Sequence, residues 1–175
     1  EDPQVLLLCG FVLTMTSEDP ELGISSCERV IRTSPNMSHW NGFLAFSFSY
    51  GNGDLQKAKE CVEKTIRVSP RDPLLFGFYN CLGQIYYQIG ELDKALEYCK
   101  SSLLMNPSWD TSHIMIIAIL VELGDIGEAE KIASKLLTLD NKTSVSRVDQ
   151  SYNFPNQNLK VKMIEGLRRA GIPEN

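Results

Sequence analysis

Hydrophobic residues recur along most of the chain three and four positions apart, which is the spacing of one face of an α-helix. In the best-defined block, Leu82 and Tyr86 lie on one apolar face, and Ala95 and Cys99 lie on another after a short polar break. This pattern predicts an all-α protein with paired helices near residues 3–16, 20–33, 37–50, 54–68, 73–88, 91–105, 110–123 and 125–139.

The polar breaks carry a repeated octet, which reads GDLQKAKE at 53–60, GELDKALE at 90–97 and GDIGEAEK at 124–131. The alanines Ala58, Ala95 and Ala129 are spaced 37 and 34 residues apart, and a glycine precedes each of them by five positions. A period near 34 residues is typical of a repeat made of one helical hairpin. The octet therefore predicts the turn and the start of the second helix in each hairpin.

The residue types suit these positions physically. Glycine ends the first helix because it adopts a left-handed backbone without a Cβ clash, and the acidic residue after it favours the start of the second helix. Alanine lets the two helices cross closely, and Gly23 takes that place in the first repeat. The fourth repeat has Ile116 and Ile117 where the third has Leu82 and Gly83, so we expect its helices to lie farther apart.

The period divides the chain into four hairpins, at about 4–35, 36–70, 71–107 and 108–141. Residues 142–156 lose the period and are expected to form an irregular linker that Tyr152 and Phe154 anchor. Residues 157–175 resume an amphipathic helix with Leu159, Met163, Ile164 and Leu167 on one face. A stack of repeats has an open apolar end that needs a cap, so we expect this helix to cover the last repeat. A partner-binding tail is the alternative.

Charge, the length of the apolar runs and the spacing of the cysteines argue against several classes of function. The net charge is −5 without a basic run, so direct binding to nucleic acid is not expected. Apolar runs fall short of the roughly 20 residues that span a bilayer, so no membrane insertion is expected. The five cysteines include no CxxC pair, which favours free thiols in a reducing, cytoplasmic compartment. Cys9 and Cys81, and likewise Cys27 and Cys99, are expected to share repeat positions and to be buried.

Catalytic patterns are weak. The two histidines, His39 and His113, each fall in the first turn of a predicted helix without a neighbouring nucleophile motif. The sequence contains neither a zinc-binding HExxH pattern nor a glycine-rich phosphate loop. We therefore expect no enzyme activity, no metal and no cofactor in this chain.

The run from about 4 to 141, and above all residues 76–107, resembles the tetratricopeptide repeat (TPR) family. The resemblance implies a right-handed α-solenoid in which the first helix of each hairpin lines a concave surface. Partner-facing positions implied by the family are the second, fifth, ninth and twelfth of each repeat, which here are Trp40, Phe43, Ser47, Tyr50, Gly77, Asn80, Gln84, Tyr87, Thr111, Ile114, Ala118 and Val121. Asn80 and Gln84 are candidates to hold the backbone of an extended peptide. Because these positions include no Lys or Arg, a clamp for carboxylate tails is not expected.

The segments SPRDPLLF (69–76) and IEGLRRAGIPE (164–174) are similar to the C-terminal TPR regions of bacterial multidomain regulators. Those regions often follow an adenylate/guanylate cyclase domain or a winged-helix domain. The resemblance implies a non-catalytic module of a longer bacterial signalling protein, with a peptide or a neighbouring domain as partner. The alternative is a self-association module, a homodimer that pairs an attached cyclase or DNA-binding domain.

Overall fold

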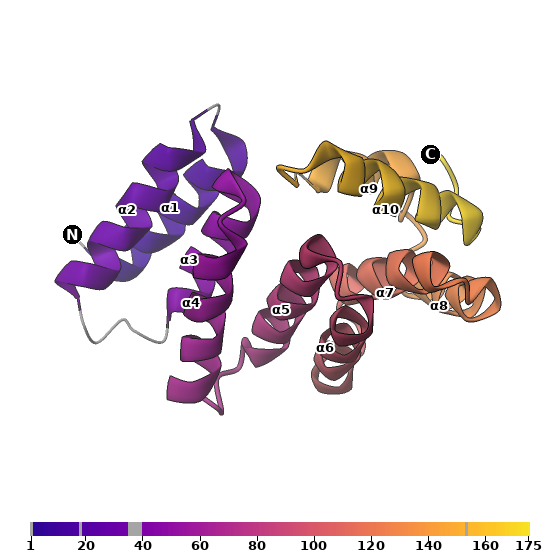
Figure 1. Ribbon diagram of the computed structural model, residues 1–175, viewed down its shortest axis with the longest axis horizontal. Coiled ribbons are helices and arrows are strands. Elements are labelled where there is room, and N and C mark those ends of the chain that lie inside the picture. Colours follow the sequence, from indigo (N-terminus) through magenta and orange to yellow (C-terminus); the bar gives the residue numbers. More distant parts are fainter. Residues whose placement is uncertain (1, 18, 35–39, 153) are drawn as a thin grey trace.

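The computed structural model describes residues 2–17, 19–34, 40–152 and 154–175, and within them it contains helices and turns without strands. The elements are α1 (Pro3–Thr16), α2 (Pro20–Thr33), α3 (Asn41–Ser47), the π-helical turn η2 (Phe48–Asn52), α4 (Leu55–Val68), α5 (Leu75–Ile89), α6 (Leu92–Met105), α7 (Asp110–Leu123), α8 (Ile126–Leu139), α9 (Val145–Ser151) and α10 (Gln157–Arg169). Consecutive helices pair as hairpins that stack side by side, and α9 and α10 lie back over the last of them (Figure 1). The all-α solenoid predicted from the sequence is confirmed.

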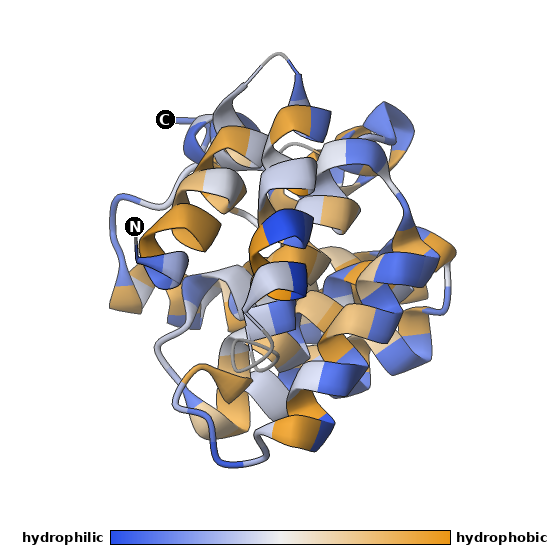
Figure 2. Cartoon of the chain, turned by 90° about the vertical axis from the view of Figure 1, so that its left-hand side faces the viewer, coloured by the Kyte–Doolittle hydropathy of each residue, from blue (hydrophilic) through white to orange (hydrophobic). Residues whose placement is uncertain are grey.

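The hairpins are held together by small residues at the helix crossings. Ala58, Ala95 and Ala129 are each 0% exposed, as the octet predicts. At Gly83 an added Cβ would lie 2.3 Å from the Sγ of Cys99, so only glycine allows α5 to approach α6 this closely. The helices α7 and α8 pack less closely than α5 and α6, in agreement with the isoleucines in α7. Figure 2 shows hydrophobic and hydrophilic positions on different sides of many helices.

The turn glycines have the backbone that the sequence predicts. Gly53, Gly90 and Gly124 have φ of 73°, 89° and 87°, in the left-handed region. The side chain of Asp54 then accepts a hydrogen bond from the backbone N–H of Lys57 at 3.1 Å and caps α4. The turns of the second, third and fourth hairpins therefore combine a glycine that ends one helix with an acidic residue that starts the next.

The first helix of the second hairpin differs from the prediction of one helix over 37–50. Residues 37–39 lie outside the described residues, α3 begins at Asn41, and the helix widens into η2, which extends to Asn52. At Gly51 an added Cβ would lie 2.7 Å from Cγ2 of Thr14 in α1. The widened turn is therefore pressed against the first hairpin, and glycine makes that contact sterically possible.

The segment 142–156 contains a short helix where an irregular linker was predicted. The side chain of Ser144 caps α9 by accepting a hydrogen bond from the N–H of Arg147 at 3.3 Å. The N–H of Val145 donates to the carbonyl oxygen of Pro173 at 2.8 Å, which fastens the C-terminal residues to α9. The helix is hard to predict from the sequence because α9 has only 7 residues and its backbone is bound by Pro173, which lies far along the chain.

The helix predicted at the C-terminus is present as α10, and it packs against α7. An added Cβ on Gly166 would lie 3.3 Å from the Cα of Ala118, so the two backbones approach closely. Met163 and Leu167 are fully buried, whereas the helix face with Lys162 and Arg169 is exposed. The amphipathic pattern is therefore used to cover α7.

The cysteines are only partly where the register predicts. Cys27, Cys81 and Cys99 are buried, and burial raises the pKa of each thiol. Cys9 is exposed, so its equivalence to Cys81 is wrong. The true equivalents are the glycines that face a cysteine of the second helix: Gly10 lies against Cys27 as Gly83 lies against Cys99. This register is shifted by one residue from the one counted along the sequence.

No described helix combines the length and the hydropathy that a membrane span requires.

The close approach of α5 and α6 yields a prediction with a control in the same helix. Gly83→Ala forces a methyl group onto the Cys99 sulfur and should lower the free energy of unfolding by about 1–3 kcal/mol. Gly77→Ala meets nothing within 4 Å, and it should raise the free energy of unfolding by up to about 1 kcal/mol because alanine favours the helix. Urea denaturation measures both, and equal effects would contradict the close crossing.

Candidate functional site

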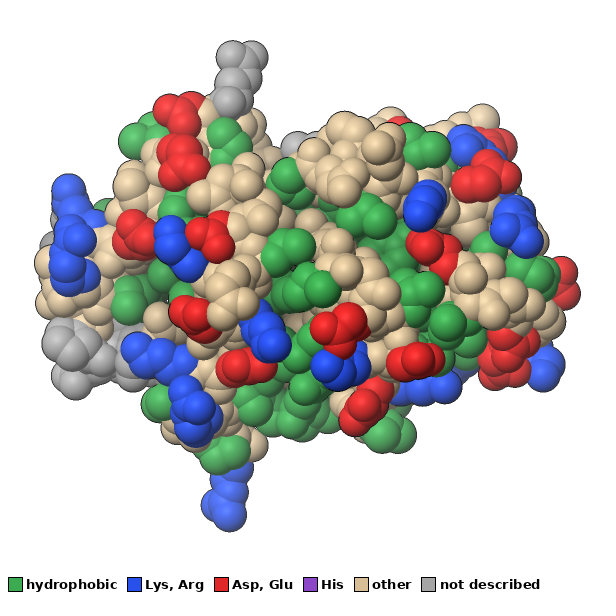
Figure 3. Space-filling view, in the orientation of Figure 1, with side chains coloured by type: hydrophobic (Ala, Val, Ile, Leu, Met, Phe, Trp, Pro, Cys, Tyr) green, Lys and Arg blue, Asp and Glu red, His purple; other side chains and the backbone are tan. Residues whose placement is uncertain are grey.

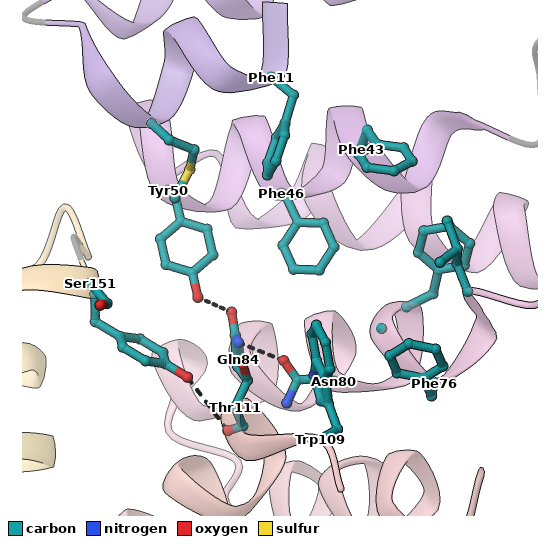
Figure 4. Close-up of a pocket in the computed structure, with 15 residues that line it drawn as sticks. Phe11, Phe43, Phe46, Tyr50, Phe76, Asn80, Gln84, Trp109, Thr111 and Ser151 are labelled. Carbon is teal, nitrogen blue, oxygen red and sulfur yellow. Dashed lines mark hydrogen bonds between the residues drawn. The ribbon is translucent and has the colours of Figure 1, made fainter. Parts of the chain in front are cut away.

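An apolar cavity of about 360 Å³ opens between the first helices of the hairpins and the C-terminal segment. Figure 4 shows side chains from α1, α3, η2, α5 and the start of α7 pointing into it. None of the residues that line it carries a formal charge at neutral pH. They are Phe11, Met15, Phe43, Phe46, Tyr50, Leu74, Phe76, Gly77, Phe78, Asn80, Gln84, Trp109, Thr111, Ser151 and Tyr152.

Aromatic rings form most of the wall. Phe43 meets Phe11 edge to face with ring centroids 5.6 Å apart, and it meets Phe78 in the same way at 6.4 Å. At the other rim Phe76 and Trp109 meet edge to face at 5.0 Å. Contacts of this geometry fix the rings, so the wall is preformed. Figure 3 shows hydrophobic side chains at the centre of one face of the molecule, with charged side chains interspersed around them.

A chain of hydrogen bonds crosses the floor of the cavity. The hydroxyl of Tyr50 donates to Oε1 of Gln84, and the side-chain amide of Gln84 donates to Oδ1 of Asn80 at 2.6 Å. The Asn80 amide donates to Oγ of Ser112 at 2.8 Å, and Ser112 donates to Oγ of Ser102 at 2.8 Å. Burial raises the pKa of Tyr50, which keeps its hydroxyl protonated as a donor. The chain joins three successive hairpins. Figure 4 shows its first two bonds, from Tyr50 to Gln84 and from Gln84 to Asn80.

The C-terminal segment fills the part of this surface next to the cavity. The ring of Phe154 stacks on that of Tyr50 with centroids 5.5 Å apart and an interplanar angle of 16°, and its centroid lies 6.4 Å from that of Tyr87. Phe154 is 0% exposed. Tyr152 is also buried, and its hydroxyl donates to the carbonyl oxygen of Thr111 at 3.4 Å. The chain thus places two of its own aromatic side chains on its concave surface.

The predicted partner-facing residues divide into three groups. Phe43, Tyr50, Asn80, Gln84 and Thr111 line the cavity, as does Gly77. Trp40 stacks on Phe43 at 5.2 Å and borders a smaller cavity with Asp72 and Pro73. The remaining residues are buried inside the chain: Ser47, Tyr87, Ile114, Ala118 and Val121.

Four of these five buried residues have an identifiable neighbour that covers them. Ser47 lies against Cys27, with Oγ and Sγ 3.9 Å apart. Tyr87 lies beneath Phe154, and its hydroxyl donates to Glu122. Ala118 and Val121 lie under Gly166 of α10. The C-terminal segment therefore covers the concave surface of the third and fourth hairpins.

Sequence reasoning missed nine of the 15 residues that line the cavity. Phe46 and Phe78 lie one position from those that the repeat register marks, because the surface is wider than one row of residues per helix. Phe76 and Trp109 lie at helix starts, where the repeat period predicts no partner-facing position. Tyr152 comes from the segment predicted to be irregular. Tyr152 and Phe154 are the residues expected from the sequence to anchor this segment, but that expectation does not place them in the cavity.

The described histidine is a structural residue. Nδ1 of His113 lies 3.0 Å from the carbonyl oxygen of Trp109, and the side chain is fully buried in α7. Burial lowers its pKa, which favours the neutral imidazole. His39 lies outside the described residues. Among the described residues no group of three or more His, Cys, Asp or Glu side chains is placed to hold a metal ion.

The hydrogen-bond chain predicts a large effect of Gln84→Leu. The change leaves the Tyr50 hydroxyl and the Asn80 carbonyl oxygen buried without the Gln84 partner, so the free energy of unfolding should fall by about 1–3 kcal/mol. Gln150→Leu on the exposed side of α9 is the control and should change it by less than about 0.5 kcal/mol. Chemical denaturation distinguishes them, and a neutral Gln84→Leu would show that the chain of bonds contributes little.

Comparisons with known proteins agree with this geometry. Residues 78–108 match the family model described as Tetratricopeptide repeat. A segment of 88 residues is 28% identical to the uncharacterized protein ycf37 of Pyropia yezoensis, and it spans 49% of this chain and 49% of that relative. The match thus spans about half the length of the curated relative.

Two solved structures have the same architecture. A thermophilic TPR protein of Thermus thermophilus, TTC0263, superposes with a TM-score of 0.70 at 19% identity, over 95% of this chain and 100% of that one. MamA superposes with a TM-score of 0.62 at 17% identity, over 89% and 88%. Tetratricopeptide repeats commonly mediate contacts between proteins and are generally non-catalytic. The chain therefore has the fold of an α-solenoid of TPR-like hairpins, and its residues 78–108 match the tetratricopeptide repeat family model.

Proposed function

We propose that this protein is a non-catalytic interaction module that binds a peptide, or a segment of a neighbouring domain, in the cavity on its concave surface. The observation that carries the proposal is the uncharged aromatic wall around about 360 Å³ of open space. Fixed aromatic side chains give large contact areas at little cost in conformational entropy, which is why they are enriched at binding sites. The protein context of a bacterial signalling regulator stays a prediction from the resemblance.

The side-chain amides in the floor of the cavity favour a partner without charge. Asn80 and Gln84 are each 1% exposed, and both donate within the chain. A side-chain amide nitrogen carries two hydrogens, so each retains one N–H beyond the bond that it makes here. A charged partner group would lose its hydration in this wall without a counter-ion, which is costly. The proposal is therefore an uncharged segment whose carbonyl groups reach these amides.

Self-association is the second candidate, and α1 favours it. Val5, Leu8, Val12 and Leu13 are exposed on this helix, and residues 3–16 contain no charged side chain. A two-fold interface places a surface against itself, so a charge-free apolar surface meets no self-repulsion. Sedimentation velocity of the wild type and of Leu8→Asp separates the candidates. A concentration-dependent dimer that Leu8→Asp abolishes supports self-association, and a monomer throughout the concentration series contradicts it.

The proposed cavity predicts the effect of Phe76→Ala. The probe is an array of synthetic, uncharged ten-residue peptides that contain aromatic residues, measured by calorimetry. Peptides that bind the wild type, with Kd on the order of 10–100 µM, should bind the variant at least about tenfold more weakly because a ring of the wall is lost. Leu104→Ala on α6, which is 86% exposed and does not line the cavity, is the control.

Circular dichroism should show that both variants remain folded. Two results contradict the proposed site: no peptide of the array binds the wild type, or Phe76→Ala binds the same peptides as tightly as Leu104→Ala does.

A further inference from the structure

Three described residues of the segment between α9 and α10, Tyr152, Phe154 and Pro155, lie on the concave surface beside η2. In Figure 1 this connection points from the α9–α10 pair toward α3. An added Cβ on Gly53, just after η2, would lie 3.5 Å from Cβ of Pro155, which confirms that the two segments are neighbours. A loop between two helices thus contacts a surface that belongs to the second and third hairpins.

From this contact we infer that the segment acts as an internal ligand, and that the partner is an uncharged, extended segment with two aromatic residues separated by one position. This inference rests on the proposed function, because it names the chemistry of the partner that the same surface takes. The chain itself presents that chemistry as Tyr152 and Phe154.

The backbone and the side chains support this interpretation. Tyr152 has φ −102° and ψ 120°, which is an extended conformation, as a bound peptide would have. Phe154 packs flat on Tyr50, and Tyr152 meets Phe154 edge to face with centroids 5.9 Å apart. Tyr152 also lines the open cavity, so the occupied surface and the cavity are continuous. A partner with the same spacing of rings can take the same contacts and extend into the open space.

The segment is anchored in a way that permits exchange. Phe154 is held by ring contacts and by a hydrogen bond from the Gln157 side-chain amide to its carbonyl oxygen at 2.9 Å. The bond from the Tyr152 hydroxyl to Thr111 is long at 3.4 Å. The helices on either side have anchors of their own: α9 is tied to Pro173, and α10 is packed on α7. The loop can therefore leave the surface while both helices stay in place. An internal ligand weakens the apparent affinity for an external one by the fraction of time that the site is free.

The test uses the chain's own segment as the probe, the synthetic peptide QSYNFPNQ, which is the sequence of residues 150–157. The matched control peptide is QSANAPNQ, which lacks both rings. Calorimetry measures each peptide against the wild-type chain and against Phe154→Ala. We expect QSYNFPNQ to bind the variant at least about tenfold more tightly than the wild type, because the site is emptied. The control peptide should bind neither.

Phe154→Leu is the second variant, and it keeps the test decisive if Phe154→Ala fails to fold. Leucine keeps an apolar side chain of similar volume but removes the stacking on Tyr50, so the variant should stay folded by circular dichroism and bind QSYNFPNQ about threefold or more tightly than the wild type. The inference is overturned if folded Phe154→Ala or Phe154→Leu binds the peptide no better than the wild type. It is equally overturned if QSANAPNQ binds as well as QSYNFPNQ.

The outcome is separable from that of the proposed function. In one outcome, peptides of the array bind the wild type and respond to Phe76→Ala, but QSYNFPNQ binds neither Phe154 variant. That outcome would overturn the internal ligand and leave the proposed interaction module standing. No binding of the array or of QSYNFPNQ to any of the proteins would overturn both.

Discussion

Burial of the Phe154 ring between Tyr50 and Tyr87 joins parts of the chain that are far apart in sequence. Tyr50 belongs to the second hairpin, Tyr87 to the third, and Phe154 to the loop that follows the fourth. A stack of hairpins makes contacts mainly between neighbours, so a contact that spans several hairpins helps to fix the curvature of the concave surface. These three rings, with the hydrogen bond from Tyr50 to Gln84, set the width of the surface and leave the open cavity beside it.

The cavity depends on the hairpins being spaced by small residues. Gly83 lets α5 approach α6, and Gly51 lets η2 press against α1. If either helix were pushed outward, the aromatic side chains of α3 and α5 would no longer face each other across the same space. The interaction proposed for the concave surface thus follows from packing, because the wall is made of residues whose helices are held by contacts on their other side.

Local signals in the sequence predicted the solenoid well. Two features depend only on neighbours within one hairpin: the left-handed turns at Gly53, Gly90 and Gly124, and the buried alanines. Because the hairpin is repeated, the same residue types recur at these positions and make the pattern visible in the sequence. The candidate site was predicted only in part. Phe43 and Tyr50 face the cavity as the register implies, but Tyr87 lies beneath Phe154 and Ala118 lies under α10. That cover depends on contacts between residues 41 and 67 positions apart in sequence, which no periodic pattern encodes. The exposure of Cys9 shows the same limit, because a one-residue error in register changes the side of a helix.

The contact between Phe154 and Tyr50 is the most direct test of this account. In a two-dimensional nuclear Overhauser spectrum of the wild-type chain, with the aromatic rings of Phe154 and Tyr50 assigned by substitution, the account predicts cross-peaks between the two rings, whose centroids lie 5.5 Å apart. Rings on Tyr87 and Phe154 should give weaker cross-peaks at 6.4 Å. A Phe154 ring without cross-peaks to either tyrosine, and with the chemical shifts of a solvent-exposed side chain, would contradict it.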